Sequence, residues 1–498
     1  MKCLKFIVKK GDIMYKKNVS IYQVLSIFLF IFFLLVQIIY CNTNTLFLNN
    51  LKVVSFMGIF LITFIVFTWY KSYYRLLSPY LAFVVLLFLF LCGQTPFWLL
   101  NQSAGFRDLT VWMNLFNSMD LCNALIFSYL CISFLHTIVI CSIDPKTKKT
   151  RTKNTTTKKI YHIIENREAY KNITIFGLIL CLGFIGPYLI TFFNQRNIIK
   201  TVGYDMQYDT LLTGTSSFFT KIADFFPLGI ITLVFAWGNK NELNKKNFFI
   251  KRIILILLSL TYLMCELLLG QRTGVVLFVF ALLFVIYKEK KIPINSLIFI
   301  GIGGLLLMAG LRIVGITRSG NVYNPLDQSN PIVDFISDTG WNLMSLSEFQ
   351  KIMPEVRNYG YGNSYIVSLL EVIPNLNFWN VHPAYVYGNI SQFLREYLGY
   401  SYGLGCTPVA EAYYNFGYFG FLIFLLWGLI LIILNRKFEN NKDLISNYTV
   451  VLFIGILLKS CVRSSFYAVF RPFLLFILLP IIILKLLSNK ELIVKEEV

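Results

Sequence analysis

The sequence predicts an all-α polytopic membrane protein with about twelve transmembrane helices and one large, partly helical outer loop. The chain of 498 residues is 56% hydrophobic and only 14% charged. Apolar runs of about 18–22 residues recur along it, and each is long enough to cross a hydrocarbon core of roughly 30 Å. The runs are continuously apolar rather than alternating, which excludes a membrane β-barrel.

The apolar runs define the predicted spans. The first begins at Ile21 and has no A-x-A-like cleavage site, so we expect a retained helix rather than a cleaved signal peptide. The predicted spans are 21–41, 53–70, 79–98, 122–143, 172–193, 218–237, 253–270, 272–287, 293–311, 413–434, 446–460 and 467–485. They divide the chain into residues 1–311 with nine helices, the outer loop 312–412, and residues 413–498 with three helices and a cytoplasmic C-terminus.

Cysteine usage argues against disulfides and metals. Several of the ten cysteines, among them Cys92, Cys131 and Cys181, lie inside apolar runs, where a thiol acts as a small apolar group. No C-x-x-C pair occurs, so neither a zinc site nor a redox site is expected.

The net charge of +20 follows membrane topology rather than a nucleic-acid surface. With both termini in the cytoplasm, the inner segments hold 31 of the 45 Lys and Arg residues and the outer segments hold 14, in keeping with the positive-inside rule. The most basic stretch, KTKKTRTKNTTTKK (146–159), fits a segment kept in the cytoplasm. We therefore expect membrane lipids, and no nucleic acid, as partners.

The two faces also differ in the type of cation. The inner set has 26 Lys and 5 Arg, whereas the outer set has 5 Lys and 9 Arg. Arginine carries a planar, always charged fork that binds phosphate or carboxylate through two hydrogen bonds. The outer face is therefore predicted to bind an anion. Its arginines are Arg107, Arg196, Arg272, Arg312, Arg318, Arg357, Arg395, Arg463 and Arg471.

Three of these arginines are predicted to lie level with the lipid headgroups. Arg272 sits in GQRTG (270–274), a tight turn between two spans. Arg312 and Arg318 follow the ninth span in GLRIVGITRSG (310–320), where the chain leaves the membrane. A lipid-linked phosphate would lie at that depth, so all three are candidate phosphate ligands. The alternative for Arg272 is an arginine that snorkels to the headgroups.

The outer loop, residues 312–412, is predicted to be ordered and functional. It is rich in aromatic residues and shows helical periodicity at 332–353 and 390–398. Long ordered loops in compact proteins are usually functional. Aromatic faces beside carboxylates and amides suit carbohydrate, and a packed cap over the membrane domain is compatible with that function.

Candidate catalytic bases in this region are few. Glu411 lies in GLGCTPVAEAYYNFGYFGF (403–421), where the loop re-enters the membrane, and the alternative is a carboxylate that serves the helix dipole. His382 in NVHPAY and Asp338 in SDTG are further candidates, with a structural role as the alternative for His382. Glu266, inside a span, is either a functional carboxylate or a buried hydrogen-bonding group.

Missing motifs exclude chemistry driven by cytosolic nucleotides. The chain has no G-x-x-x-x-G-K-[ST], no D-x-D and no G-x-S-x-G. An enzyme acting on the outer face must therefore use a donor that is already activated in the membrane, such as a polyprenyl diphosphate sugar.

In these motifs the chain resembles the O-antigen polysaccharide polymerases of the Wzy type. The resemblance rests on GQRTG, the arginines after the ninth span, and three further stretches. These are DFISDTGWNLMSLSEFQ (334–350), YGYGNSYIVSLLEVIPN (359–375) and GLGCTPVAEAYYNFGYFG (403–420).

The resemblance implies a metal-independent glycosyltransferase with a GT-C-like fold and no cofactor. It would polymerise polyprenyl-diphosphate-linked oligosaccharide repeat units into O-antigen or capsular-type polysaccharide at the outer face of the bacterial cytoplasmic membrane. The growing chain would be the donor and a newly flipped repeat unit the acceptor. Arg272, Arg312 and Arg318 would then bind the diphosphate. A chain-length regulator and a flippase are the expected protein partners.

Two alternatives stay open at this point. An O-antigen ligase would use the same donor but transfer the chain to a lipid A core sugar. A lipid-linked oligosaccharide flippase or other transporter would instead place polar residues and a cavity at mid-membrane depth.

The charge distribution generates a topology prediction. In a cysteine-free background, a cysteine at Ser329 should react with an impermeant thiol reagent in intact cells, because 312–412 faces outward. A cysteine at Lys153 should stay unlabelled until the membrane is permeabilised. The reverse pattern would reject the predicted orientation.

Overall fold

The computed structural model describes most of the chain. The described residues are 4–10, 13–42, 47–73, 76–100, 109–143, 159–202, 222–237, 245–287, 331–373, 379–399, 405–439 and 444–486. The predicted span 293–311 and the candidate ligands Arg312 and Arg318 lie outside these residues.

The chain divides into two compact units that interleave along the sequence. Unit 1 comprises Met1–Ile160, Ile336–Ser364 and Gly405–Glu439. Unit 2 comprises Tyr161–Phe335, Tyr365–Leu404 and Asn440–Val498. Residues of the predicted outer loop therefore contribute to both units.

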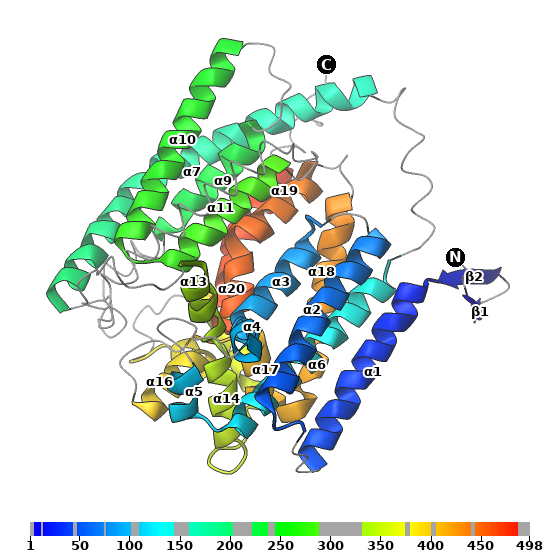
Figure 1. Ribbon diagram of the computed structural model, residues 1–498. Helices are drawn as coiled ribbons and strands as arrows, with labels where there is room; N and C mark the ends of the chain where they lie inside the picture. The colour runs from blue at the N-terminus through cyan, green and yellow to red at the C-terminus, as the bar shows by residue number, and fades with distance from the viewer. Residues whose placement is uncertain are drawn as a thin grey trace. The chain divides into compact units, whose positions relative to one another are not determined.

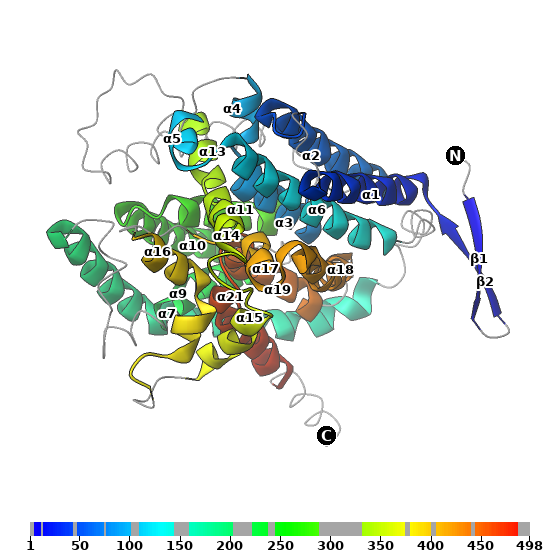
Figure 2. The ribbon, with the colours of Figure 1, turned by 90° about the horizontal axis from the view of Figure 1, so that it is seen from below.

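Helix α6 forms the centre of unit 1. Most of its residues are buried, and four of the longer helices of the unit are among those that pack against it (Figures 1 and 2). Close approach is possible because Gly58 has no side chain and Tyr129 occupies the space beside it. The five helices are α1 (Ile21–Asn42), α2 (Leu51–Tyr73), α3 (Pro79–Cys92), α6 (Ser118–Cys141) and α18 (Phe424–Glu439).

A buried hydrogen-bond chain joins three of these helices. The Nε2 atom of His136 on α6 lies 3.0 Å from Thr68 Oγ1 on α2. Its Nδ1 atom lies 2.6 Å from the hydroxyl of Tyr80 on α3. Both ring nitrogens thus have protein partners, which a polar group needs where water is absent.

One end of unit 1 carries a set of short helices. Tyr40 donates a 2.7 Å hydrogen bond to Met119 O, and Ser118 donates a 3.0 Å bond to Asn49 O, so α1, α2 and α6 meet at this end. The rings of Trp98, Trp112 and Trp341 form a cluster there. The short helices of this unit are α4 (Thr95–Leu100), α5 (Leu109–Leu115), α14 (Leu343–Ile352), α17 (Pro408–Phe416) and the 3₁₀ segment η6 (Gly417–Ile423).

Unit 2 is also helical. Helix α9 contacts α10, α11 and α19, which run alongside it (Figure 1). Thr232 on α9 lies 2.7 Å from the buried hydroxyl of Tyr448 on α19, so this interface is also linked by a polar contact. Its described elements outside the predicted outer loop are α7 (Lys159–Val202), α9 (Phe225–Trp237), α10 (Lys245–Leu268), α11 (Arg272–Tyr287), α19 (Leu444–Leu452), η7 (Phe453–Leu457), α20 (Leu458–Arg463), α21 (Tyr467–Phe473) and η8 (Leu474–Leu478).

Segments of the predicted outer loop complete the two units. The helical periodicity at 332–353 is confirmed by α13 (Pro331–Gly340) and α14, and that at 390–398 by α16 (Ile390–Leu398). The other elements are α15 (Asn363–Ser368), η4 (Leu369–Val372) and η5 (Ala384–Gly388).

The predicted helical membrane fold is confirmed, although the count of twelve spans stays a prediction. Among the described residues, seven helices are long and apolar enough to cross a membrane. They are 21–42, 51–73, 118–141, 170–201, 408–439, 444–463 and 467–486. Shorter apolar helices cover 79–92, 225–237 and 274–286, and α10 covers the predicted span 253–270.

One local prediction was wrong. The span predicted at 79–98 is not one helix, because α3 ends at Cys92 and α4 begins at Thr95. Pro96 has no N–H to donate to Cys92 O, and the Thr95 hydroxyl donates to that carbonyl at 2.7 Å instead. Before the first helix, β1 (Leu4–Lys10) and β2 (Ile13–Val19) pair as an antiparallel hairpin.

Candidate functional site

Glu411 lies in the first turn of α17. The Thr407 side chain accepts a 3.2 Å hydrogen bond from Ala410 N, and Pro408 follows it at the first helical position. This is a favourable start for a helix, because the cap satisfies a free N–H and proline needs no partner there. The TPVAE sequence therefore fixes the position of the Glu411 carboxylate in the first turn of α17.

A buried hydrogen-bond network surrounds this carboxylate. Glu411 is 1% exposed, and Ser364 donates a 2.8 Å hydrogen bond to its Oε1. The Asn415 amide donates to Ser364 Oγ at 2.8 Å and to the Glu411 carbonyl at 2.9 Å. In turn, Gly362 N donates to Asn415 Oδ1 at 3.0 Å.

Two sequence motifs meet in this network. Gly360 N donates to Tyr414 O and Tyr361 N donates to Asn415 O, each at 2.9 Å, so the chain around 360 runs along the end of α17. YGYGNS (359–364) and AEAYYNFG (410–417) are thereby joined inside unit 1. A carboxylate that accepts a hydrogen bond from a hydroxyl group can take up or orient a proton. It can equally hold a loop in place.

His382, in unit 2, has both ring nitrogens engaged by the backbone. Its Nε2 lies 3.0 Å from Ile373 O, and its Nδ1 accepts a 3.1 Å hydrogen bond from Ala384 N. These partners assign the proton to Nε2, and Trp379 packs against the ring edge-on. These contacts favour a structural role for His382 over a catalytic one.

Asp338 lies on α13 and belongs to unit 1, as Glu411 does. The neighbouring Ser337 ties this helix to the rest of the unit, because Gln94 Nε2 donates to Ser337 O at 2.7 Å and to Ser337 Oγ at 2.9 Å.

The GQRTG segment is a tight turn, as predicted. Helix α10 ends at Leu268, Gly270 adopts a left-handed conformation at φ 76°, and α11 begins at Arg272. Gln271 N donates a 2.9 Å hydrogen bond to Glu266 O, which closes the turn. Glycine suits this conformation because it has no Cβ. The side chain of Arg272 lies outside the described part of the structure.

Charged side chains from distant segments gather in unit 2. Tyr188 on α7 donates a 3.1 Å hydrogen bond to Glu266 Oε1. Asp224 interacts electrostatically with both Lys459 on α20 and Arg471 on α21. Arg471 Nη1 lies 3.3 Å from Glu371 Oε1, which pairs α21 with η4.

Sequence reasoning found only part of this charged group. Arg463 and Arg471 are among the predicted outer arginines but not among the predicted site residues. Lys459 and Asp224 are not among the site candidates. The signal for Lys459 was available, since a lysine inside a predicted span is a functional candidate.

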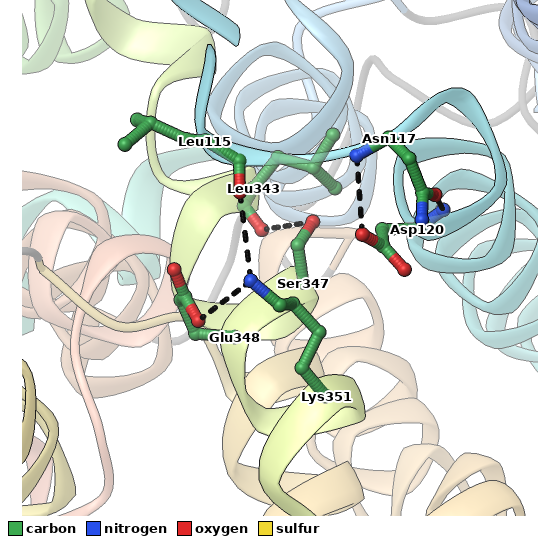
Figure 3. Close-up of polar contacts among 7 residues, drawn as sticks. All are labelled: Leu115, Asn117, Asp120, Leu343, Ser347, Glu348 and Lys351. Atoms are coloured by element: carbon green, nitrogen blue, oxygen red, sulfur yellow. Dashed lines mark hydrogen bonds and ion pairs between the residues drawn. The ribbon is translucent and has the colours of Figure 1, made fainter. Parts of the chain in front are cut away.

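A second carboxylate that sequence reasoning left out is Glu348 on α14 (Figure 3). Its side chain is 7% exposed, and the Lys351 ammonium lies 3.8 Å from its Oε2. Lys351 also donates a 3.5 Å hydrogen bond to Leu115 O at the end of α5, over the ring of Phe116. Burial raises the pKa of Glu348, and the nearby Asp120 carboxylate raises it further, whereas Lys351 acts in the opposite direction.

Figure 3 also shows how the helices around Glu348 are fixed. Asp120 and Asn117 form a capping box at the start of α6, with bonds of 2.8 Å and 3.2 Å. Ser347 donates a 3.3 Å hydrogen bond to Leu343 O within α14.

Within the described ranges, His, Cys, Asp and Glu side chains form no group of three or more that could hold a metal ion.

The sequence matches a known protein family. A sequence model of the family described as O-antigen polysaccharide polymerase Wzy matches residues 22–492, nearly the whole chain. Comparisons with curated proteins and with solved structures found no match.

The raised pKa of Glu348 generates a prediction on stability. Its ionised form is disfavoured in the folded protein, so wild-type stability falls as the pH rises above the pKa of an unfolded glutamate. Glu348→Gln cannot ionise. The melting temperature of the variant minus that of the wild type, measured in detergent, should therefore increase from pH 4 to pH 7.5.

The matched control is Glu355→Gln, because Glu355 is exposed. A melting-temperature difference for Glu348→Gln that stays constant or decreases over the same pH range would show that burial does not disfavour the charged carboxylate.

Proposed function

The chain belongs to the O-antigen polysaccharide polymerase Wzy family, and on that premise we propose that it extends a polyprenyl-diphosphate-linked glycan at the outer face of the bacterial cytoplasmic membrane. The family implies a polymerising glycosyltransferase that acts on lipid-linked oligosaccharide repeat units, and the apolar helices make this chain a multi-pass membrane protein. The product is O-antigen or a capsular-type polysaccharide.

The proposed reaction needs no metal. The acceptor hydroxyl oxygen, on the non-reducing end of a newly flipped repeat unit, forms a bond with the anomeric carbon of the donor chain. The bond from that carbon to the phosphate oxygen breaks, and polyprenyl diphosphate leaves with the electron pair. A protein base takes the hydroxyl proton.

Arg272, Arg312 and Arg318 are proposed to bind the departing diphosphate. Guanidinium groups held in place before the reaction stabilise the developing charge most strongly where water is excluded. The backbone of Arg272 supports this role, because it opens α11, and the first N–H groups of a helix favour an anion. Arg312 and Arg318 are included because both follow the predicted ninth span, where the chain is expected to leave the membrane.

Glu411 is proposed as the base, or as the group that orients the acceptor sugar. The observation that carries this assignment is the 2.8 Å hydrogen bond that Ser364 donates to it, at the meeting point of two motifs that the family resemblance highlighted. Asp338 and His382 remain the competing candidates.

The remaining parts of the proposal concern the setting of the enzyme. Residues 312–412 form the outer loop above a GT-C-like set of twelve spans, with both termini in the cytoplasm. A flippase delivers the repeat units and a chain-length regulator limits extension. The family match favours this function over the ligase and the flippase considered from the sequence.

The glycolipid profile of a strain that lacks the protein tests the function. We expect single repeat units attached to the carrier or to the core, and no longer chains. Accumulation of long carrier-linked chains would instead identify a ligase.

The arginine assignment predicts that Arg272→Ala, Arg312→Ala and Arg318→Ala each lower the rate of chain extension at least about tenfold, the size of one lost charge-assisted contact. Arg→Lys should restore only part of the rate, since lysine keeps the charge but loses the fork. Lys221→Ala serves as the control. Full rates in all three alanine variants, at equal membrane abundance, would eliminate the diphosphate clamp.

The base assignment predicts that Glu411→Gln lowers the extension rate at least about 10²-fold, because glutamine keeps the size but cannot accept the proton. Protein abundance and melting temperature are measured alongside the rate, and Glu396→Gln on the exposed side of α16 is the control. Near-normal rates in Glu411→Gln, with loss of activity in His382→Ala or Asp338→Asn, would move the base elsewhere.

A further inference from the structure

Side chains from two helices press against the first turn of α11. A Cβ atom built on Gly274 would lie 3.1 Å from Glu266 Oε2 on α10 and 3.3 Å from Lys459 Nζ on α20. The last glycine of GQRTG therefore leaves room for a carboxylate and an ammonium. Both groups lie beside Gly274, which is two residues along the chain from Arg272.

The two charged groups differ in how they are held. Glu266 is oriented by the hydroxyl of Tyr188 at 3.1 Å. Within the described part of the chain, the Lys459 ammonium makes neither a hydrogen bond nor an ion pair shorter than 4 Å. It interacts electrostatically with Glu266, Asp224 and Arg463. A lysine ammonium has three N–H donors, so this one can still serve a ligand.

Besides Lys459, this charged group contains the cations Arg463 and Arg471 and the carboxylates Glu266 and Asp224. Arg471 is neutralised by Glu371 at 3.3 Å. Lys459 and Arg463 stand four residues apart on α20, so they project from one side of that helix. A purely structural lysine inside a span would be expected to have its donors satisfied by the protein, because water is scarce there.

We propose that Lys459 is a further diphosphate-binding residue beside the GQRTG turn, with the Glu266 carboxylate as its electrostatic neighbour. The proposal rests on the proposed function, because the ligand is the polyprenyl diphosphate of that reaction. Lys459 contacts a phosphate oxygen, whereas Glu266 acts on the lysine at longer range and offsets part of its charge. A site with cations alone would retain the polyprenyl diphosphate product, so the carboxylate also aids its release.

The two residues should therefore have opposite effects on product affinity. The probe is farnesyl diphosphate, a short soluble polyprenyl diphosphate, and the measurement is its dissociation constant for the purified full-length protein in detergent. Lys459→Met should weaken binding at least about tenfold, and Lys459→Arg should keep most of it. Glu266→Gln should tighten binding several-fold and slow turnover at saturating donor.

Gly274→Ala tests the geometry of the site without changing its charges. The added methyl group would meet both Glu266 and Lys459, so it should weaken binding although every charge is retained. Shortening the carboxylate in the double variant Gly274→Ala with Glu266→Asp should recover part of the affinity. Lys200→Met is the matched control, because Lys200 is an exposed lysine in the last turn of α7 in the same unit.

The outcomes separate this proposal from the proposed function. Dissociation constants of Lys459→Met and Glu266→Gln within about twofold of wild type, or changes in the same direction, would overturn the role of Lys459, while an active and diphosphate-binding wild type would leave the polymerase standing. Absence of both diphosphate binding and chain extension in the wild type would overturn the function itself. Melting temperatures of all variants identify any that fail to fold. If Lys459→Met is one of them, the dissociation constant of Lys459→Arg is compared with that of the wild type instead.

Discussion

The scarcity of water inside a membrane is the constraint on which this structure depends. Polar groups there need partners from the protein, because an unpaired one costs several kcal/mol, on the order of a whole hydrogen bond. The chain meets this need with links between helices. His136 joins Thr68 to Tyr80 in unit 1, and Thr232 joins Tyr448 in unit 2.

The same scarcity of water makes the partners of buried charged groups informative about function. Glu411 is almost fully buried, yet Ser364 and Asn415 surround it with hydrogen-bonding groups. Glu266 is held by Tyr188, whereas Lys459 interacts with its neighbours only at longer range. Where a charge lacks a close partner in such a medium, a ligand that supplies one is the simplest physical reason for keeping it.

The sequence predicts the features that depend on local pattern. Apolar runs define helices because length and composition alone decide whether a segment can span. The GQRTG turn follows from two glycines between two such runs, and periodicity at 332–353 and 390–398 identifies α13, α14 and α16. The break before Thr95 was missed, although Pro96 carried the signal. The hairpin was not predicted, although strand-forming residues flank Gly-Asp in KFIVKKGDIMYKK.

The assembly of the sites could not be predicted in this way. Ser364 and Glu411 are 47 residues apart, and nothing in their local pattern shows that they share a hydrogen bond. Lys459 and Gly274 are 185 residues apart in the sequence. Contacts at such separations are set by helix packing, which depends on side-chain shape across the whole fold rather than on any one segment.

Reconstitution of the purified protein with a single lipid-linked repeat unit is the most direct test of the central claim. The account predicts a ladder of carrier-linked oligomers, with one polyprenyl diphosphate released for each glycosidic bond formed. A protein that retains its fold but forms no oligomers from this substrate, or releases diphosphate by hydrolysis without forming a glycosidic bond, would contradict it.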